Sequence, residues 1–332
     1  MSRRWVAVST LVGAFVSLAP ATAQVTVGEH FLGTTTSQDL ELRVDSARAL
    51  GLLDTAGTPN LVCGSDSNEV TAGRVGATIG GGGNTSPNEN RVGGDYGVVG
   101  GGLGNVAGGE LSVDDYPDAA VGGGTGNVAL ADRTTVGGGI SNLATEVDST
   151  VAGGELDQAA GLASAVGGGH HNQATGGYST IPGGQDGQAS LYGQLAFSSG
   201  GFASQSATAQ SSLFVLRQVT TTNTPLDLLL DGSSEPLTVP SGKTVAFRIL
   251  VAARSDGGDS AGYLATGLIA NHAGTTALVG TPTITVLGED DTAWNLFVSA
   301  DDGNDALSIK GLGRPATTVR WVATVETTEV AQ

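Results

Sequence analysis

Acidic clusters and one histidine pair are the parts of the sequence whose residue types could bind a metal. Asp301, Asp302 and Asp305 lie close together in the chain, and hard cations such as Ca²⁺ take carboxylate oxygens as ligands. His170-His171 offers two imidazoles, which bind zinc and related metals. The acidic run matches no EF-hand pattern, and turn carboxylates are its simpler interpretation. We therefore predict no cofactor, and we keep Ca²⁺ at the acidic cluster and a metal at the histidine pair as open alternatives.

Enzymatic chemistry has little support in the residue pattern. The runs of three glycines lack the Lys-Ser/Thr of a phosphate-binding loop, and no G-x-S-x-G nucleophile motif is present. The regular part of the chain holds few of the Asp, Arg, Lys and aromatic residues that line the clefts of enzymatic solenoids. Two carboxylates alone can serve a glycoside hydrolase, so the acidic clusters leave that class open. We predict a protein that is not an enzyme and has no catalytic residues.

The main feature of the chain is one sequence motif repeated at a fixed spacing, for example TTVGGGISNLA and SAVGGGHHNQA. From residue 121 to 181 the apolar anchors recur every 15 residues, and each is followed by a glycine pair, usually by Asn or Asp, and by Ala. The structural anchors are Val99, Val121, Val136, Val151, Val166 and Ile181. The asparagine positions are Asn105, Asn127, Asn142 and Asn172. A short fixed period predicts a stacked β-solenoid.

Each repeat should form one coil of two short strands. Val and Thr favour extended backbone, and glycine permits the corner. We expect Gly138→Val to damage assembly far more than Ser141→Val, because Gly138 lies in a corner where positive φ or close approach leaves no room for a β-branched side chain. Stacked coils would place the asparagines in a ladder, each amide bonding its neighbours above and below. Degenerate copies of the motif extend the repeats back to Val62 and forward to Phe197, which gives nine predicted coils.

One coil offers a single Val or Ile and one Ala, which is too little apolar surface to offset the ordering of so many glycines. Packing against sister chains is the usual remedy for a thin core. The repeat resembles the head of trimeric autotransporter adhesins (the YadA-like head) over about residues 62–207. That resemblance implies a parallel β-roll of three chains. The family's stalk and membrane anchor have no counterpart in the sequence, so we do not carry over the autotransporter label.

Beyond residue 208 the period is lost and short alternating strands take over. Phe247 and Ile249 share one face of a strand, and Trp321 and Ala323 share one face of another. Glycine- and aspartate-rich turns between such strands indicate an antiparallel β-sandwich. The phrase VAFRILVAAR resembles, more loosely, a β-rich terminal domain of phage tail-fibre proteins and exported bacterial proteins. The predicted fold is all-β, a β-roll followed by a sandwich.

The net charge and the N-terminal sequence indicate which partners the chain can have and where it is located. The chain carries 14 basic and 32 acidic residues, a formal charge of −18, which argues against nucleic acid and anionic membranes as partners. A basic start, a short apolar run and Ala21-Thr22-Ala23 predict a signal peptide over residues 1–23 and no transmembrane anchor afterwards. We expect a lead-in at 24–60, the roll at 61–207, the sandwich at 208–332, and a location outside the cell, on its surface or in the periplasm.

These features together predict an exported, non-enzymatic structural or adhesion protein, a homotrimer that displays a binding module. Two alternatives stay open. In the first, the sandwich is a carbohydrate-binding module and a glycan or cell-surface molecule is its ligand. In the second, the roll binds ice through the hydroxyl column formed by Thr134, Ser149, Ser164 and Ser179.

Overall fold

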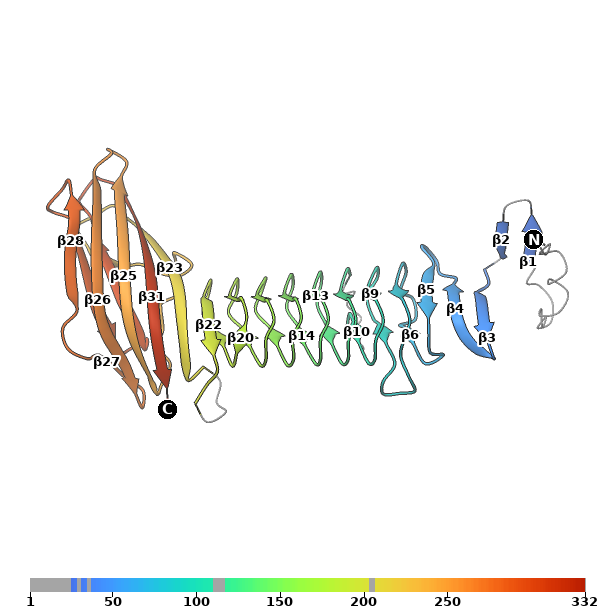
Figure 1. Ribbon diagram of the computed structural model, residues 1–332. Coiled ribbons are helices and arrows are strands. Elements are labelled where there is room, and N and C mark those ends of the chain that lie inside the picture. Colours follow the sequence, from blue (N-terminus) through green and yellow to red (C-terminus); the bar gives the residue numbers. More distant parts are fainter. Residues whose placement is uncertain (1–24, 29–30, 35–36, 110–116, 203–206, 332) are drawn as a thin grey trace, which may run out of the picture.

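The chain forms a straight rod with a broader domain at its C-terminal end (Figure 1). The computed structural model describes residues 25–28, 31–34, 37–109, 117–202 and 207–331. Every regular element in these ranges is a β-strand, and coils of parallel strands are followed by antiparallel sheets, so the predicted fold class is confirmed. The predicted signal peptide lies outside the described residues. No helix that could cross a membrane is present in the described ranges.

The N-terminal strands lead into the roll. β1 (Val25–Gly28) and β2 (Phe31–Thr34) form a hairpin, and β3 (Leu40–Val44) and β4 (Ala47–Leu53) form a second one. β4 then pairs antiparallel with β5 (Asn60–Cys63), the first strand of the roll. The second hairpin therefore covers a sheet edge that would otherwise expose unpaired backbone groups.

The roll is built from two parallel sheets, which we call the valine sheet and the alanine sheet after their inward-facing residues. Besides β5, the valine sheet contains β7 (Thr78–Ile79), β9 (Val98–Val99), β11 (Ala120–Val121), β13 (Thr135–Val136), β15 (Thr150–Val151), β17 (Ala165–Val166), β19 (Thr180–Ile181) and β22 (Leu195–Ser199). The alanine sheet contains β6 (Glu69–Val70), β8 (Arg91–Val92), β10 (Val106–Ala107), β12 (Val128–Ala129), β14 (Leu143–Ala144), β16 (Gln158–Ala159), β18 (Gln173–Ala174) and β21 (Gln188–Ala189). Isolated parallel bridges and β20 (Gly184–Gln185) complete the third side.

The interior of the roll is as thin as the sequence suggests. The six anchors lie in the valine sheet, fully buried against the column of alanines, of which Ala144 is one. At the last coil the register differs from the expectation that Phe197 begins it. Ala196 occupies the buried position, and Phe197 is 56% exposed. A strand has a side-chain period of two, so a shift of one residue moves the ring from the core to the surface.

The hydroxyl column considered for ice binding faces inward. Thr134, Ser149, Ser164 and Ser179 are all buried, and the Thr134 hydroxyl donates to the Ala131 carbonyl at 2.6 Å. Side chains that cannot reach the surface cannot contact ice. The structure therefore contradicts the ice-binding alternative in the form that rested on this column.

The asparagine column is buried, and its bonds go mainly to the backbone of the stack. Asn127 Oδ1 accepts a hydrogen bond from the backbone N–H of Asn142 at 3.0 Å. Asn127 Nδ2 donates to the carbonyl of Gly123 in its own coil at 2.8 Å and to that of Gly139 in the next coil at 2.9 Å. The amide thus bonds three backbone groups, of which the Gly139 carbonyl also accepts from the Thr125 N–H at 3.0 Å.

The closest backbone contact at the corner of the coil is made by the third glycine. Gly139 has φ +97°, and a Cβ added there would lie 2.1 Å from the carbonyl oxygen of Gly154 in the next coil. Gly138 also has positive φ, +157°, which L side chains rarely adopt, but a Cβ there would approach only the Gly123 carbonyl oxygen, at 3.8 Å. Ser141 is itself left-handed, with φ +55°, which disfavours a β-branched residue. Valine is therefore strained at both positions, and the expectation that it does far more damage at Gly138 than at Ser141 stays a prediction.

The C-terminal domain is a two-layered sandwich. Its long layer contains β23 (Ala209–Thr220), β31 (Val319–Ala331), β25 (Lys243–Ser255), β26 (Ser260–His272), β27 (Thr275–Leu278) and β28 (Thr283–Glu289), all antiparallel. The short layer contains β24 (Leu226–Asp227), β30 (Ala306–Leu312) and β29 (Asn295–Asp301). Between them Trp321 stacks on Tyr263 at 6.2 Å between ring centroids and lies 6.0 Å from Trp294. The Trp321 indole N–H donates to Thr220 Oγ1 at 2.9 Å.

The roll and the sandwich share one continuous sheet. β22 pairs parallel with β19 on one side and antiparallel with β23 on the other, where Leu195 faces Leu213. Figure 1 shows the row of short strands running on into β23, β31, β25, β26 and β28. The outward sides of the valine sheet and of the long layer are therefore the same side of a single sheet.

Candidate functional site

The three acidic residues considered as a cation site are engaged by hydrogen bonds from their own loop and from strand β27. Asp301 accepts from the Asn304 backbone N–H at 3.2 Å and from its side-chain Nδ2 at 2.8 Å, and these bonds lower the pKa of Asp301. Asp302 accepts from the Thr276 N–H at 2.6 Å, and Asp305 from the Thr276 hydroxyl at 2.8 Å. Within the described ranges, no group of three or more His, Cys, Asp or Glu could hold a metal ion.

The histidine pair lies on the third side of the roll. The rings of His170 and His171 are 6.1 Å apart between centroids. His171 Nδ1 lies 2.9 Å from the carboxylate of Asp186, which is nearly buried, and this contact lowers the pKa of Asp186. His171 therefore contributes a polar contact between neighbouring coils.

A polar cleft of about 160 Å³ lies in the short layer of the sandwich and includes one of the predicted residues, Asp301. Its polar lining side chains are Asp227, Ser234, Asp301, Asn304 and Ser308. The Ser308 hydroxyl donates to Asp227 Oδ1 at 2.6 Å. Two carboxylates, an amide and two hydroxyls around one hollow are groups that can hydrogen-bond to a polyhydroxylated ligand.

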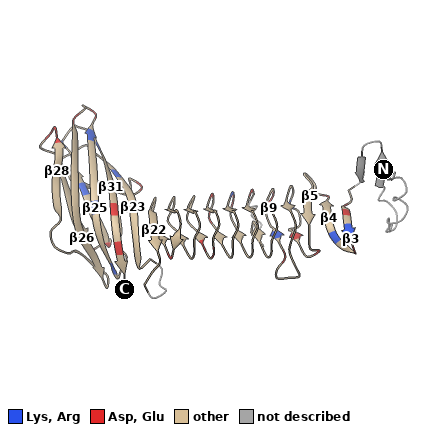
Figure 2. Cartoon of the chain, viewed as in Figure 1, with Lys and Arg blue, Asp and Glu red and all other residues tan. Residues whose placement is uncertain are grey.

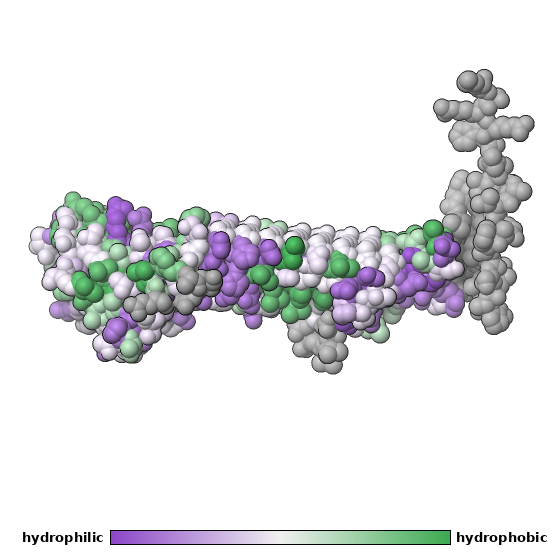
Figure 3. Space-filling model, turned by 60° about the horizontal axis from the view of Figure 1, so that its bottom comes forward, coloured by the Kyte–Doolittle hydropathy of each residue, from purple (hydrophilic) through white to green (hydrophobic). Residues whose placement is uncertain are grey.

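The outward side of the valine sheet carries no charge between residues 78 and 197. Its outward side chains form one column of Thr78, Val98, Ala120, Thr135, Thr150, Ala165, Thr180 and Leu195. A second column contains Gly80, Gly100, Gly122, Gly137, Ala152, Gly167, Pro182 and Phe197. Figure 2 shows how few charges the strands of the roll carry, and Figure 3 shows large parts of its surface with near-neutral hydropathy. The result is a flat face of small, uncharged residues on a strongly acidic protein.

The same side of the sheet becomes apolar on the sandwich. Val215 is 52% exposed, Leu250 47% and Val322 46%, and they lie on adjoining strands of the long layer. Arg248 and Glu326 border this band, with an Nη1 to Oε2 distance of 3.1 Å. We call the outward side of the valine sheet and of the long layer together the outer face. Contiguous exposed apolar surface of this kind marks interaction sites.

At the bend between roll and sandwich the outer face is hollowed. A groove of about 580 Å³ is lined by Leu195, Phe197 and Leu213 on the apolar side and by Arg248 and Glu326 on the polar side. Phe197 is the aromatic ring that the sequence reading assigned to the last repeat. The pairing of β22 with β23 brings it to this groove.

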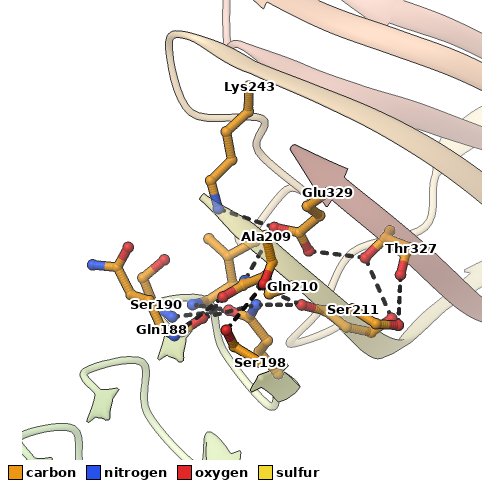
Figure 4. Close-up of polar contacts among 12 residues, drawn as sticks. Gln188, Ser190, Ser198, Ala209, Gln210, Ser211, Lys243, Thr327 and Glu329 are labelled. Carbon is orange, nitrogen blue, oxygen red and sulfur yellow. Dashed lines mark hydrogen bonds and ion pairs between the residues drawn. The ribbon is translucent and has the colours of Figure 1, made fainter. Parts of the chain in front are cut away.

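A buried polar network fixes the sandwich to the last coil (Figure 4). Glu329 receives Lys243 Nζ at 2.9 Å, Gln210 Nε2 at 3.0 Å and the Thr327 hydroxyl at 2.9 Å. Gln210 also bonds both backbone groups of Gln188 in the roll, at 3.0 and 3.1 Å. Because these groups are buried and mutually satisfied, the angle between roll and sandwich is set by specific bonds.

Sequence reasoning missed the outer face and this network. A signal for the face was present, since the residue before each anchor is Thr, Ala or Val in every copy from 78 to 180. The network combines residues more than 100 positions apart, such as Gln210 and Glu329, and no local sequence pattern predicts such a contact.

Comparison with known proteins finds only distant structural similarity. No protein-family model matches the chain, and no curated protein matches its sequence. One similar structure is the tailspike protein gp49 of Acinetobacter baumannii bacteriophage Fri1, described as a capsular polysaccharide depolymerase. It is 9% identical, with a TM-score of 0.23 over 79% of this chain and 61% of that one. Another is the tailspike protein of Acinetobacter phage vB_ApiP_P1, 11% identical, with a TM-score of 0.21 over 84% and 70%.

These comparisons correct one prediction. The sequence pattern led us to expect a protein that is not an enzyme, but one of the similar structures is described as a depolymerase, which is an enzyme. We therefore do not retain that expectation. Because the chain spans only 61% of that tailspike and the TM-scores lie below 0.25, the likeness assigns no activity, substrate or assembly to this chain.

Proposed function

We propose that the chain is the subunit of an extracellular structural protein that self-associates through its outer face and displays the sandwich at one end. The observation that carries this proposal is the outward side of the valine sheet, which is uncharged from residue 78 to residue 197 on a chain whose formal charge is −18. Because like charges repel, an uncharged surface favours association between copies of an acidic chain. Such a face also supplies the packing partner that the thin interior of each coil lacks.

We further propose that the assembly is a homotrimer. The number of chains rests on the resemblance of the repeat phrase to trimeric adhesin heads. Small residues such as Thr150, Ala165 and Gly167 would let three valine sheets approach closely around one axis. An adhesion or display role suits a rod of this shape.

The test is to place a charge on the proposed contact. Thr150→Arg, on the outer face, should reduce the mass measured by light scattering, because three guanidinium groups would be buried without partners. Gln173→Arg is the matched control, since Gln173 projects outward from the alanine sheet. If the Thr150→Arg protein keeps the mass of the unmodified protein, the outer face is not the contact.

Carbohydrate binding is a second proposal, supported by the polar cleft of the short layer. That layer lies on the far side of the sandwich from the outer face, so association would leave the cleft open. Its carboxylate, amide and hydroxyl groups match the hydrogen-bonding needs of a sugar.

Glycan arrays with the full chain test this second proposal. Asp227→Asn should lower binding at least tenfold, whereas Asp256→Asn, at an exposed turn elsewhere, should leave it unchanged. The same bound glycans should then be assayed for new reducing ends, since two carboxylates in a cleft can also serve hydrolysis. Equal binding by both variants would remove the cleft from consideration.

A further inference from the structure

One position of the asparagine column is occupied by an acid, Asp157. It is fully buried, like the asparagines above and below it. Asp157 Oδ1 accepts from the backbone N–H of Asn172 at 2.8 Å and from its Nδ2 at 3.0 Å. Asp157 Oδ1 therefore has the same role as Oδ1 of Asn142 one coil earlier. That Asn142 oxygen accepts a hydrogen bond from the backbone N–H of Asp157 at 3.0 Å.

The second oxygen, Oδ2, lies where every neighbouring asparagine has its Nδ2 group. A Cβ added to Gly154 would lie 2.3 Å from Asp157 Oδ2, just as a Cβ added to Gly139 would lie 2.6 Å from Asn142 Nδ2. At the asparagine, that nitrogen donates to the carbonyls of Gly138 at 2.8 Å and Gly154 at 2.9 Å. Asp157 Oδ2 is buried and has no hydrogen-bond partner.

An ionised carboxylate is a poor occupant of this position. The corresponding carbonyls, those of Gly153 and Gly169, are acceptors, and a charged oxygen there would face them with no donor between. A protonated carboxyl has an O–H in the same place and can donate to one of them, as the asparagine N–H does. A buried ion without a partner is far more costly than a neutral group.

We propose that Asp157 is a proton-binding site of the roll, held protonated in the folded chain at pH values where exposed aspartates are ionised. Burial raises the pKa of Asp157, and the hydrogen bonds from Asn172 oppose that shift only in part. His170 and His171 of the next coil also favour ionisation, although His171 is engaged by Asp186. Glu155, two residues earlier, is exposed.

The sign of the pH effect follows from the raised pKa. The folded state binds this proton more tightly than the unfolded chain does. The stabilisation that this proton gives the folded state is therefore complete below the pKa of an unfolded aspartate, about 3.9. It declines as the pH rises towards the pKa of Asp157 in the folded chain. This coil of the roll should be more stable in mild acid than at neutral pH.

The experiment uses a reciprocal pair of full-length variants at one protein concentration. Asp157→Asn should raise the melting temperature at pH 7.5 and change it little near pH 4, because an amide donates without needing a proton. Asn142→Asp should have the opposite effect. Its melting temperature should be lower than that of the unmodified protein at pH 7.5 and should return towards it in acid. Isotope-edited infrared spectra of the unmodified protein at neutral pH should contain a protonated carboxyl band that Asp157→Asn removes.

Two results would overturn the proposal. The first is that Asp157→Asn melts at or below the temperature of the unmodified protein at pH 7.5. The second is that Ca²⁺ raises, and a chelator lowers, the melting temperature of the unmodified protein while leaving Asp157→Asn unaffected. In that case a metal ion, and not a proton, would neutralise the carboxylate.

Discussion

At the scale of the residue, the second and third glycines of a corner are not equivalent. The third has positive φ and close backbone contact with the next coil, as in Gly139. Gly153, a second glycine, lies outside the positive-φ range and has only a distant neighbour at 4.0 Å. We expect Gly139→Ala to lower the free energy of unfolding by about 2 kcal/mol or more, because strained φ alone costs about 1–3 kcal/mol. Gly153→Ala should change it by less than about 0.5 kcal/mol. Chemical denaturation of both proteins measures the difference, and equal midpoints would contradict the assignment.

The sequence could predict which residues face the core of the roll, because Val136 and Ala144 recur at fixed spacing. It could not distinguish Gly138 from Gly139, since both are glycine in every regular copy and their backbone angles depend on contact with the next coil. The candidate metal ligands illustrate the same limit. Asp302 and Asp305 are three positions apart in sequence, but their bonds to Thr276 on another strand determine their environment.

At the scale of the element, the asparagine column joins successive coils. Asn127→Ala would leave the Asn142 N–H and the Gly123 carbonyl buried without their partner, and an unsatisfied buried group costs about 1–3 kcal/mol. We expect a loss of about 2 kcal/mol or more in the free energy of unfolding. Gln158→Ala, on the outward side of the alanine sheet, is the control and should cost under about 1 kcal/mol. Urea unfolding followed by circular dichroism compares them, and similar losses would refute a structural role for the column.

The junction network gives a second prediction at this scale. Lys243→Met should destabilise the protein by about 3 kcal/mol or more, because it leaves Glu329 charged and buried. Glu329→Gln should cost less, since an amide keeps hydrogen bonds and removes the charge. Tryptophan fluorescence of Trp294 and Trp321 reports unfolding of the sandwich. A larger loss for Glu329→Gln than for Lys243→Met would contradict this order.

Strand pairing was predictable only where the sequence repeats. The 15-residue period implies parallel neighbours, and the structure pairs Val136 with Val151 accordingly. The sandwich has alternating patterns for its faces but no period that orders its strands, so the pairing of β23 with β31 had to come from the structure. At β22, Ala196 and not Phe197 takes the buried position of the last coil, a one-residue difference in register that the irregular last copy of the repeat did not reveal.

At the scale of the whole molecule, the roll and sandwich form one sheet with one outer face, and that continuity is the main consequence of the fold. Although the chain is acidic, the part of this face on the valine sheet carries no charge from Thr78 to Phe197. The apolar band of Val215, Leu250 and Val322 extends the face over the sandwich. We interpret the face as the contact between copies of the chain.

Sedimentation equilibrium of the full chain tests this central claim most directly. The account predicts a mass three times that of one chain at micromolar concentration, and a lower mass for Thr150→Arg. Unfolding should also shift to higher temperature as the protein concentration rises, because association stabilises the folded state. A folded protein that sediments as a single chain at these concentrations would contradict the account.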